Sequence, residues 1–171
     1  MRLWTVQHRA VLESLEDAGE LVGDWVRIMV GNYRACYEEM VAEMARRGLD
    51  CGGRPPVWAW AGPDTRDNSV ALTAEMLLCP QTPEEYARYV MLDLDVPDEA
   101  VLLSSYGRWN DFMEAIIMGE ESPDMDWSIG QEELNGVQAC LPRVAAGWVL
   151  GVHPLEPFRP EEEDEEDGIG S

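Results

Sequence analysis

The sequence has few of the residues that build common metal and nucleophile sites. It contains only two histidines, and its four cysteines are scattered without a C-x-x-C pair. Because zinc ligands normally lie at close local spacing, we expect no metal site and no bound cofactor. Neither a G-x-S-x-G motif nor a P-loop occurs. The usual sequence signals for a serine nucleophile and for a triphosphate cradle are therefore missing.

Long apolar runs are also missing. No segment approaches the ~20 residues needed to span a bilayer, and the opening residues MRLWTVQHRAV lack the apolar region and cleavage site of a signal peptide. We therefore expect a soluble cytoplasmic protein that makes no contact with a membrane. In that compartment its cysteines should be reduced, and most of them should be packed in the core.

Basic residues are scarce in this chain. It has 12 Lys plus Arg against 34 Asp plus Glu, which gives a formal net charge of −22. Seven of the acids lie in residues 161–167, but the rest of the chain is strongly acidic as well. Such a surface repels phosphate backbones, so direct binding of nucleic acid is disfavoured. The charge can serve solubility, or it can mimic a nucleic acid and so occupy a basic partner; solubility is the commoner role.

The length and composition suit one folded domain. The chain has 171 residues, of which 46% are hydrophobic. Short apolar strands and amphipathic helices follow one another without a strict β-α-β rhythm. We therefore expect a single compact α+β domain over residues 1–152, with a small mixed or antiparallel sheet packed by about four helices. Residues 153–171 are rich in proline, acid and glycine, and we expect them to form a disordered tail.

Two helices are predicted in the first third of the chain. Apolar residues recur at helical spacing over residues 7–18, and Gly19 follows as a helix-ending residue. A second amphipathic pattern covers residues 32–47 and stops at Gly48.

Further helices are predicted in the second half. Residues 82–85, T-P-E-E, have the form of a capping box with proline at the first helical position. Either Ser104 or Ser105 can cap a helix that ends at Gly119. We also expect residues 132–148 to be partly helical.

Two strands carry the most informative patterns. The segment VWAWA places Trp58 and Trp60 on one face of a strand. In residues 88–96, apolar residues alternate with Asp93 and Asp95. Two carboxylates on one strand face can perform acid–base chemistry or bind Mg²⁺. A strand buried on one face more commonly leaves such acids in water, and we expect both to be solvated.

Several longer motifs occur together in this chain. They are LWTVQ at 3–7, PPVWAW at 55–60, PDTR at 63–66, LDLDVPDEAVLLSSYGRW at 92–109, and a late Trp148. This combination resembles the bacterial family known as domain of unknown function 3841, over nearly the whole chain up to about Val149. The resemblance implies one compact domain in a bacterial or phage cytosol. It implies no particular activity, because the function of that family is unassigned.

Six side chains form a candidate ligand-binding set: Trp4, Gln7, Trp58, Trp60, Arg66 and Trp109. Tryptophan faces stack on planar rings, and arginine pairs with phosphate or carboxylate, so this set around one pocket could hold a nucleotide. Alternatively, the tryptophans pack beneath a helix and the arginine forms a salt bridge in a loop, since apolar periodicity usually marks the core.

Three functions are compatible with these observations. The leading hypothesis is a soluble binding or regulatory module for a protein or small-molecule ligand, because no catalytic constellation is present. The second is a small nucleotide-using enzyme. The opening order of strand, helix and glycine is similar to that of compact ADP-ribosyltransferase folds, although Thr5 stands where a histidine is often expected. The third is an acidic mimic that inhibits an enzyme acting on nucleic acid.

Overall fold

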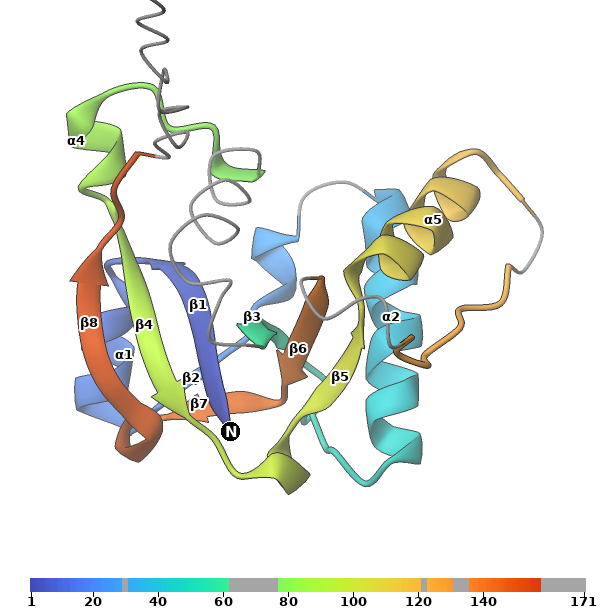
Figure 1. Cartoon of the computed structure of the whole chain (residues 1–171), viewed down its shortest axis with the longest axis horizontal. Helices are drawn as coiled ribbons and strands as arrows, with labels where there is room; N and C mark the ends of the chain where they lie inside the picture. Colours follow the sequence, from blue (N-terminus) through green and yellow to red (C-terminus); the bar gives the residue numbers. More distant parts are fainter. Residues whose placement is uncertain (29–30, 62–76, 121–122, 131–135, 158–171) are drawn as a thin grey trace, which may run out of the picture.

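The computed structural model describes residues 1–28, 31–61, 77–120, 123–130 and 136–157 (Figure 1). These residues form an α+β fold around a six-stranded antiparallel sheet, as predicted. In spatial order its strands are β5 (Leu102–Ser105), β6 (Val137–Leu141), β3 (Val57–Ala61), β1 (Arg2–His8), β4 (Tyr89–Asp95) and β8 (Val149–Pro154). A second, two-stranded sheet consists of β2 (Glu20–Val22) and β7 (Arg143–Ala145).

The helices differ widely in length. The α-helices are α1 (Val11–Ala18), α2 (Gly31–Arg46), α4 (Pro83–Tyr86) and α5 (Tyr106–Ile117). Short 3₁₀ turns complete the described elements: η1 (Trp25–Arg27), η3 (Asp98–Ala100) and η4 (Ala146–Trp148). Among the described helices, none combines the length and the apolar character that crossing a bilayer requires.

One face of the large sheet is covered by α1 and the small sheet. Leu3 of β1 and Leu92 of β4 belong to the same buried cluster as Val11 and Leu15 of α1, and Val144 of β7 joins them. Figure 1 shows α1 behind β8 and β4.

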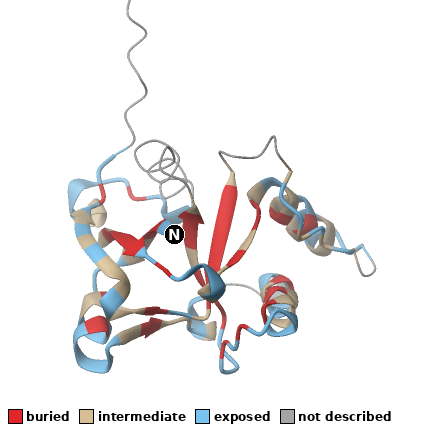
Figure 2. Cartoon of the chain, turned by 60° about the horizontal axis from the view of Figure 1, so that its bottom comes forward, coloured by how far each residue is buried: buried red, intermediate tan, exposed pale blue. Residues whose placement is uncertain are grey.

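The opposite face is covered by α2 and α5 over β5, β6 and β3. Met40 and Met44 of α2 meet Trp109 of α5 above Leu102 and Cys140 of the sheet. Figure 2 shows the buried residues following the central strands and the inner sides of the helices. The sheet therefore separates two apolar clusters.

The predicted caps are confirmed, but the predicted start of the first helix at residue 7 is wrong, because β1 runs to His8 and α1 begins at Val11. Helix α1 ends at Gly19, whose φ of 73° is the left-handed conformation that glycine adopts easily. Thr82 and Glu85 form the expected capping box at the start of α4. Ser105 accepts a hydrogen bond from the Arg108 amide and so caps α5.

Among the described residues, the prediction that residues 132–148 are partly helical holds only for the 3₁₀ turn η4, because β6 and β7 occupy most of the range. Val137–Leu141 is the strand β6, buried throughout and paired on both sides, with β3 and with β5. An apolar run this short does not distinguish strand from helix by periodicity, so the two neighbouring strands decide its conformation. Pro142 separates β6 from β7 and cannot continue a helix.

The end of the domain lies slightly beyond residue 152. Strand β8 continues to Pro154, and Leu155 is buried. Residues 158–171, which make up most of the predicted tail, lie outside the described residues.

Candidate functional site

The large sheet is split between its two central strands. Strand β1 pairs with β4 along its whole length, but it pairs with β3 only through Leu3–Ala61 and Trp4–Trp60. Residues 55–56, directly before β3, are both proline and cannot donate backbone hydrogen bonds to a neighbouring strand. The regular ladder between the two strands ends at Trp4, several residues before the position at which these prolines would face β1.

Side chains replace the missing ladder at this point. The Thr5 hydroxyl donates a hydrogen bond to the Trp58 carbonyl. Gln7 in turn donates from Nε2 to Thr5 Oγ1 at 2.8 Å. This relay fixes the orientation of the Gln7 amide and leaves its oxygen as an acceptor.

A pocket of about 370 Å³ opens at the split. This cavity, hereafter the split pocket, is enclosed by β1, α1, β2, η1 and the start of β3. Its lining includes Gln7, Arg27, Tyr37, Arg54 and Trp58. The volume falls at the lower end of the ~300–1,000 Å³ typical of small-molecule sites.

A tight turn directs Arg54 to the pocket. The Arg54 amide donates to the Cys51 carbonyl at 3.0 Å, and the two central residues, Gly52 and Gly53, have φ of 59° and 75°. Positive φ at both central positions defines a type I′ turn, which other residues adopt at a cost. The Gly-Gly pair thus explains how the chain reverses here before the prolines.

Trp25 ties η1 to this turn. Its indole nitrogen donates to the Gly53 carbonyl at 2.7 Å. The Arg34 guanidinium stacks over the Trp25 ring at 4.7 Å from the ring centroid. Since η1 contains Arg27 and the turn ends at Arg54, this hydrogen bond holds both arginines at one rim of the split pocket.

Arg27 and Arg54 are both exposed, and neither forms an ion pair with any described residue. Most other described arginines are neutralised by an acid: Arg2, Arg34, Arg46, Arg47, Arg108 and Arg143. Arg27 and Arg54 share this lack of an ion pair with Arg9 and Arg88, but of these four only Arg27 and Arg54 line the split pocket.

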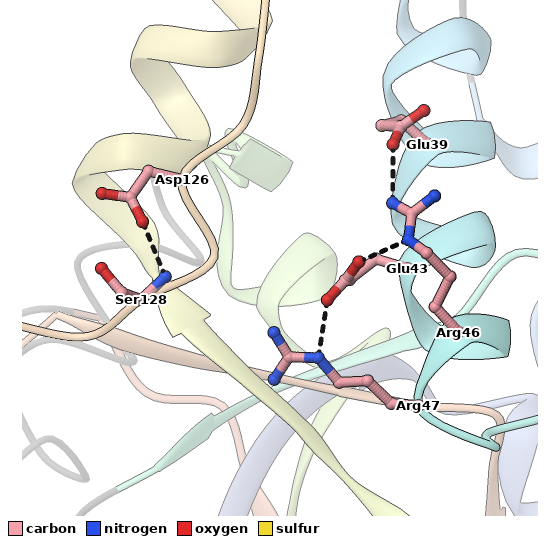
Figure 3. A network of polar contacts seen from close by, with 6 residues as sticks. All are labelled: Glu39, Glu43, Arg46, Arg47, Asp126 and Ser128. Atoms are coloured by element: carbon pink, nitrogen blue, oxygen red, sulfur yellow. Dashed lines mark hydrogen bonds and ion pairs between the residues drawn. The ribbon is translucent and has the colours of Figure 1, made fainter.

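Helix α2 shows the usual pattern for comparison (Figure 3). Glu43 accepts hydrogen bonds from Arg46 at 2.7 Å and from Arg47 at 2.6 Å, and Arg46 also reaches Glu39 at 2.9 Å. Partial burial by itself would raise the pKa of Glu43, but the two arginines outweigh burial and lower it. These ion pairs join side chains on the surface of α2 and leave none of these residues for the split pocket.

The described lining offers little for acid–base chemistry. Its carboxylate, Asp24, accepts a hydrogen bond from the Val26 amide and thereby caps η1. Tyr37 is a poor proton donor, because burial raises the pKa of its hydroxyl. Within the described residues, no three His, Cys, Asp or Glu side chains lie together as they would around a metal ion. The arrangement can hold a ligand by stacking, hydrogen bonding and charge.

The predicted tryptophans occupy two adjoining aromatic clusters. Trp4 and Trp60 are buried together, whereas Trp58 and Trp109 pack with α2. Tyr106 links the clusters, with ring centroids 5.9 Å from Trp58 and 4.8 Å from Trp60. Trp58 and Trp60 therefore share one strand face, as predicted.

Five of the six predicted residues lie in the described part of the chain. Gln7 and Trp58 line the split pocket, and Trp4, Trp60 and Trp109 are absent from its lining. Arg66 lies outside the described residues. The sequence analysis missed Arg27, Tyr37 and Arg54. The motif CGGRPP could have indicated Arg54, because a double-glycine turn followed by prolines restrains the backbone on both sides of the arginine.

The expectation that Asp93 is solvated is wrong. Asp93 is 8% exposed and forms an ion pair with Arg2. Trp4, directly opposite it on β1, is also buried, so this part of the strand face is shielded from water. No described residue donates to Asp93 Oδ1. Asp95 is exposed, as expected.

The fold and the pocket define a small α+β protein with a ligand-sized cavity at an opening between central strands. The chain belongs to the family described as domain of unknown function (DUF3841), whose family model matches residues 2–128. This confirms the family resemblance and includes every residue of the split pocket named above. Comparison with curated proteins and with solved structures found no match.

Proposed function

We propose that this protein is a binding or regulatory module whose ligand is a small organic anion held in the split pocket. The observation that carries the proposal is the presence of Arg27 and Arg54, both without acidic partners among the described residues, at the rim of a cavity lined by Trp58 and Tyr37. Arginine binds carboxylate and phosphate groups through a planar, permanently charged fork.

Binding is favoured over catalysis by the chemistry of the lining. The carboxylate of Asp24 is used as a helix cap, and neither histidine nor cysteine is among the described residues that line the pocket. A regulatory module needs only to bind its ligand and to change its own stability or exposed surface when the ligand is bound. The proposal includes the expected bacterial cytosolic setting, which suits four cysteines outside any disulfide.

Calorimetric titration with a panel of small aromatic and aliphatic anions tests this proposal. At least one aromatic anion should bind, and Arg54→Gln should weaken it by about tenfold, the loss of one charge-assisted pair. Arg88→Gln is the matched control. Arg88 is equally exposed and has no ion pair with a described residue, but it does not line the split pocket. Equal affinity in both variants, or no binding across the panel, contradicts the proposal.

A nucleotide-using transferase is the second candidate. The lining of arginine, glutamine and aromatic rings that favours an anion would also suit part of a dinucleotide substrate. Incubation with NAD, followed by detection of free nicotinamide, separates the two functions. Nicotinamide release that disappears in Arg54→Gln would favour the transferase over the binding module.

A further inference from the structure

We propose that the ligand of the split pocket is a free nucleoside monophosphate, with its phosphate between Arg27 and Arg54 and its base against Trp58 and Tyr37. This inference rests on the proposed function and specifies its ligand class.

Arg27 and Arg54 are the two cations that we assign to the phosphate. They come from separate segments, η1 and the turn before β3, which the Trp25–Gly53 hydrogen bond of 2.7 Å holds together. Gly23, just before η1, lies against the carbonyl of Pro55, just after Arg54, so a second contact fixes the same two segments. A phosphate monoester dianion has three terminal oxygens and can accept hydrogen bonds from both guanidinium groups at once. A carboxylate has only two oxygens for the same donors.

The inner part of the pocket suits a planar base. Trp58 and Tyr37 line it with ring centroids 6.1 Å apart at an interplanar angle of 42°. Gln7 adds an amide oxygen whose position is fixed by Thr5. Flat aromatic surface beside a hydrogen-bond acceptor matches the face of a nucleobase and an amino group on its edge.

Size and charge limit the ligand to one nucleotide. A cavity of about 370 Å³ is at the small end of ligand sites, which favours one nucleotide over the larger dinucleotide. The net charge of −22 repels a polynucleotide, whose phosphates continue beyond the two arginines. A free mononucleotide has one anionic group and needs one cationic rim.

The test is calorimetric titration of the full chain with four nucleoside 5′-monophosphates, their nucleosides, inorganic phosphate, NAD and a short single-stranded oligonucleotide. We expect at least one monophosphate to bind at least tenfold more tightly than its nucleoside or phosphate alone. NAD should bind no more tightly, and the oligonucleotide should not compete. Arg27→Gln and Arg54→Gln should each remove about tenfold, and Arg88→Gln should leave affinity unchanged.

The possible failures are distinguishable. If another aromatic anion binds through Arg54 while the monophosphates do not, the nucleotide assignment is overturned and the binding module stands. If a monophosphate and its nucleoside bind equally, the phosphate site is overturned. Absence of binding by all anions overturns both proposals. Because Arg27 and Arg54 are exposed, their variants should keep the parent melting temperature, which the same samples report.

Discussion

Gly23 lies against Pro55 so closely that a Cβ atom on Gly23 would stand 2.0 Å from the Pro55 carbonyl oxygen. The obstructing atom belongs to the backbone and cannot turn aside. We therefore predict that Gly23→Ala pushes the two segments apart, lowers the free energy of unfolding by about 1–3 kcal/mol, and weakens ligand binding. Urea unfolding measures the first effect and calorimetry the second.

Gly147→Ala is the control for this change. A Cβ at Gly147 meets no atom within 4 Å, so the alanine should be neutral or stabilising by about 0.4–1 kcal/mol. Equal stability of the two alanine variants would show that Gly23 and Pro55 are not in contact.

The ion pair between Arg2 and Asp93 leads to a second prediction. Arg2→Ala leaves a buried carboxylate without its cation, and should cost about 1–3 kcal/mol in urea unfolding. Adding Asp93→Ala should recover part of the loss, because the unpaired charge is gone. Asp95→Asn, on the same strand but exposed, should change stability by less than about 0.5 kcal/mol. A double variant less stable than Arg2→Ala alone would contradict this account.

Glu43 should make stability depend on pH. Burial tends to raise its pKa, yet hydrogen bonds from Arg46 and Arg47 lower it overall, so folding favours the charged form. The resulting stabilisation is present above the unfolded pKa of about 4.3 and is lost as pH falls through the lower folded value. We expect Glu43→Gln to cost about 1 kcal/mol at neutral pH and almost nothing near pH 3. Thermal unfolding across this range measures the difference.

Glu38→Gln is the comparison for that series. Glu38 pairs with Arg34 alone, and both side chains are more than half exposed. Its effect should stay below about 0.5 kcal/mol at neutral pH. A cost for Glu43→Gln that does not decline in acid would rule out the arginine pairing as its cause.

The cysteines should differ sharply in reactivity. Cys79 is exposed, whereas Cys36, Cys51 and Cys140 are buried, and burial raises the pKa of all three buried thiols. A thiol-specific chromogenic reagent at pH 8 should therefore modify one thiol rapidly in the native protein and the others only after unfolding. Cys79→Ser should abolish the rapid phase. Two or more rapid thiols would contradict the described packing.

Local signals in the sequence predicted the elements that depend on local contacts. The capping box of Thr82 and Glu85 and the glycine cap at Gly19 need only neighbouring residues, so their positions were predictable. Strand β6 was not, because its five residues acquire strand geometry only between β3 and β5. Its conformation is decided by partners distant in the chain.

The candidate site was predictable only in part, for the same reason. Gln7 and Trp58 were chosen for their chemistry, and both line the split pocket. Arg27 and Arg54 matter because they lack acidic partners, a property that depends on how the whole chain folds. The burial of Asp93 likewise depends on Trp4 and Arg2 of a neighbouring strand.

The two-pair junction between β1 and β3 divides the sheet mechanically into two three-stranded halves that meet at a narrow seam. Twisting about this seam breaks few hydrogen bonds, so amide hydrogens at Trp4 and Trp60 should exchange sooner than those within β4. A ligand bound in the split pocket would contact both halves of the sheet and slow this amide exchange. Ligand binding would then reduce the flexibility of the whole sheet, out to its two edge strands, β5 and β8.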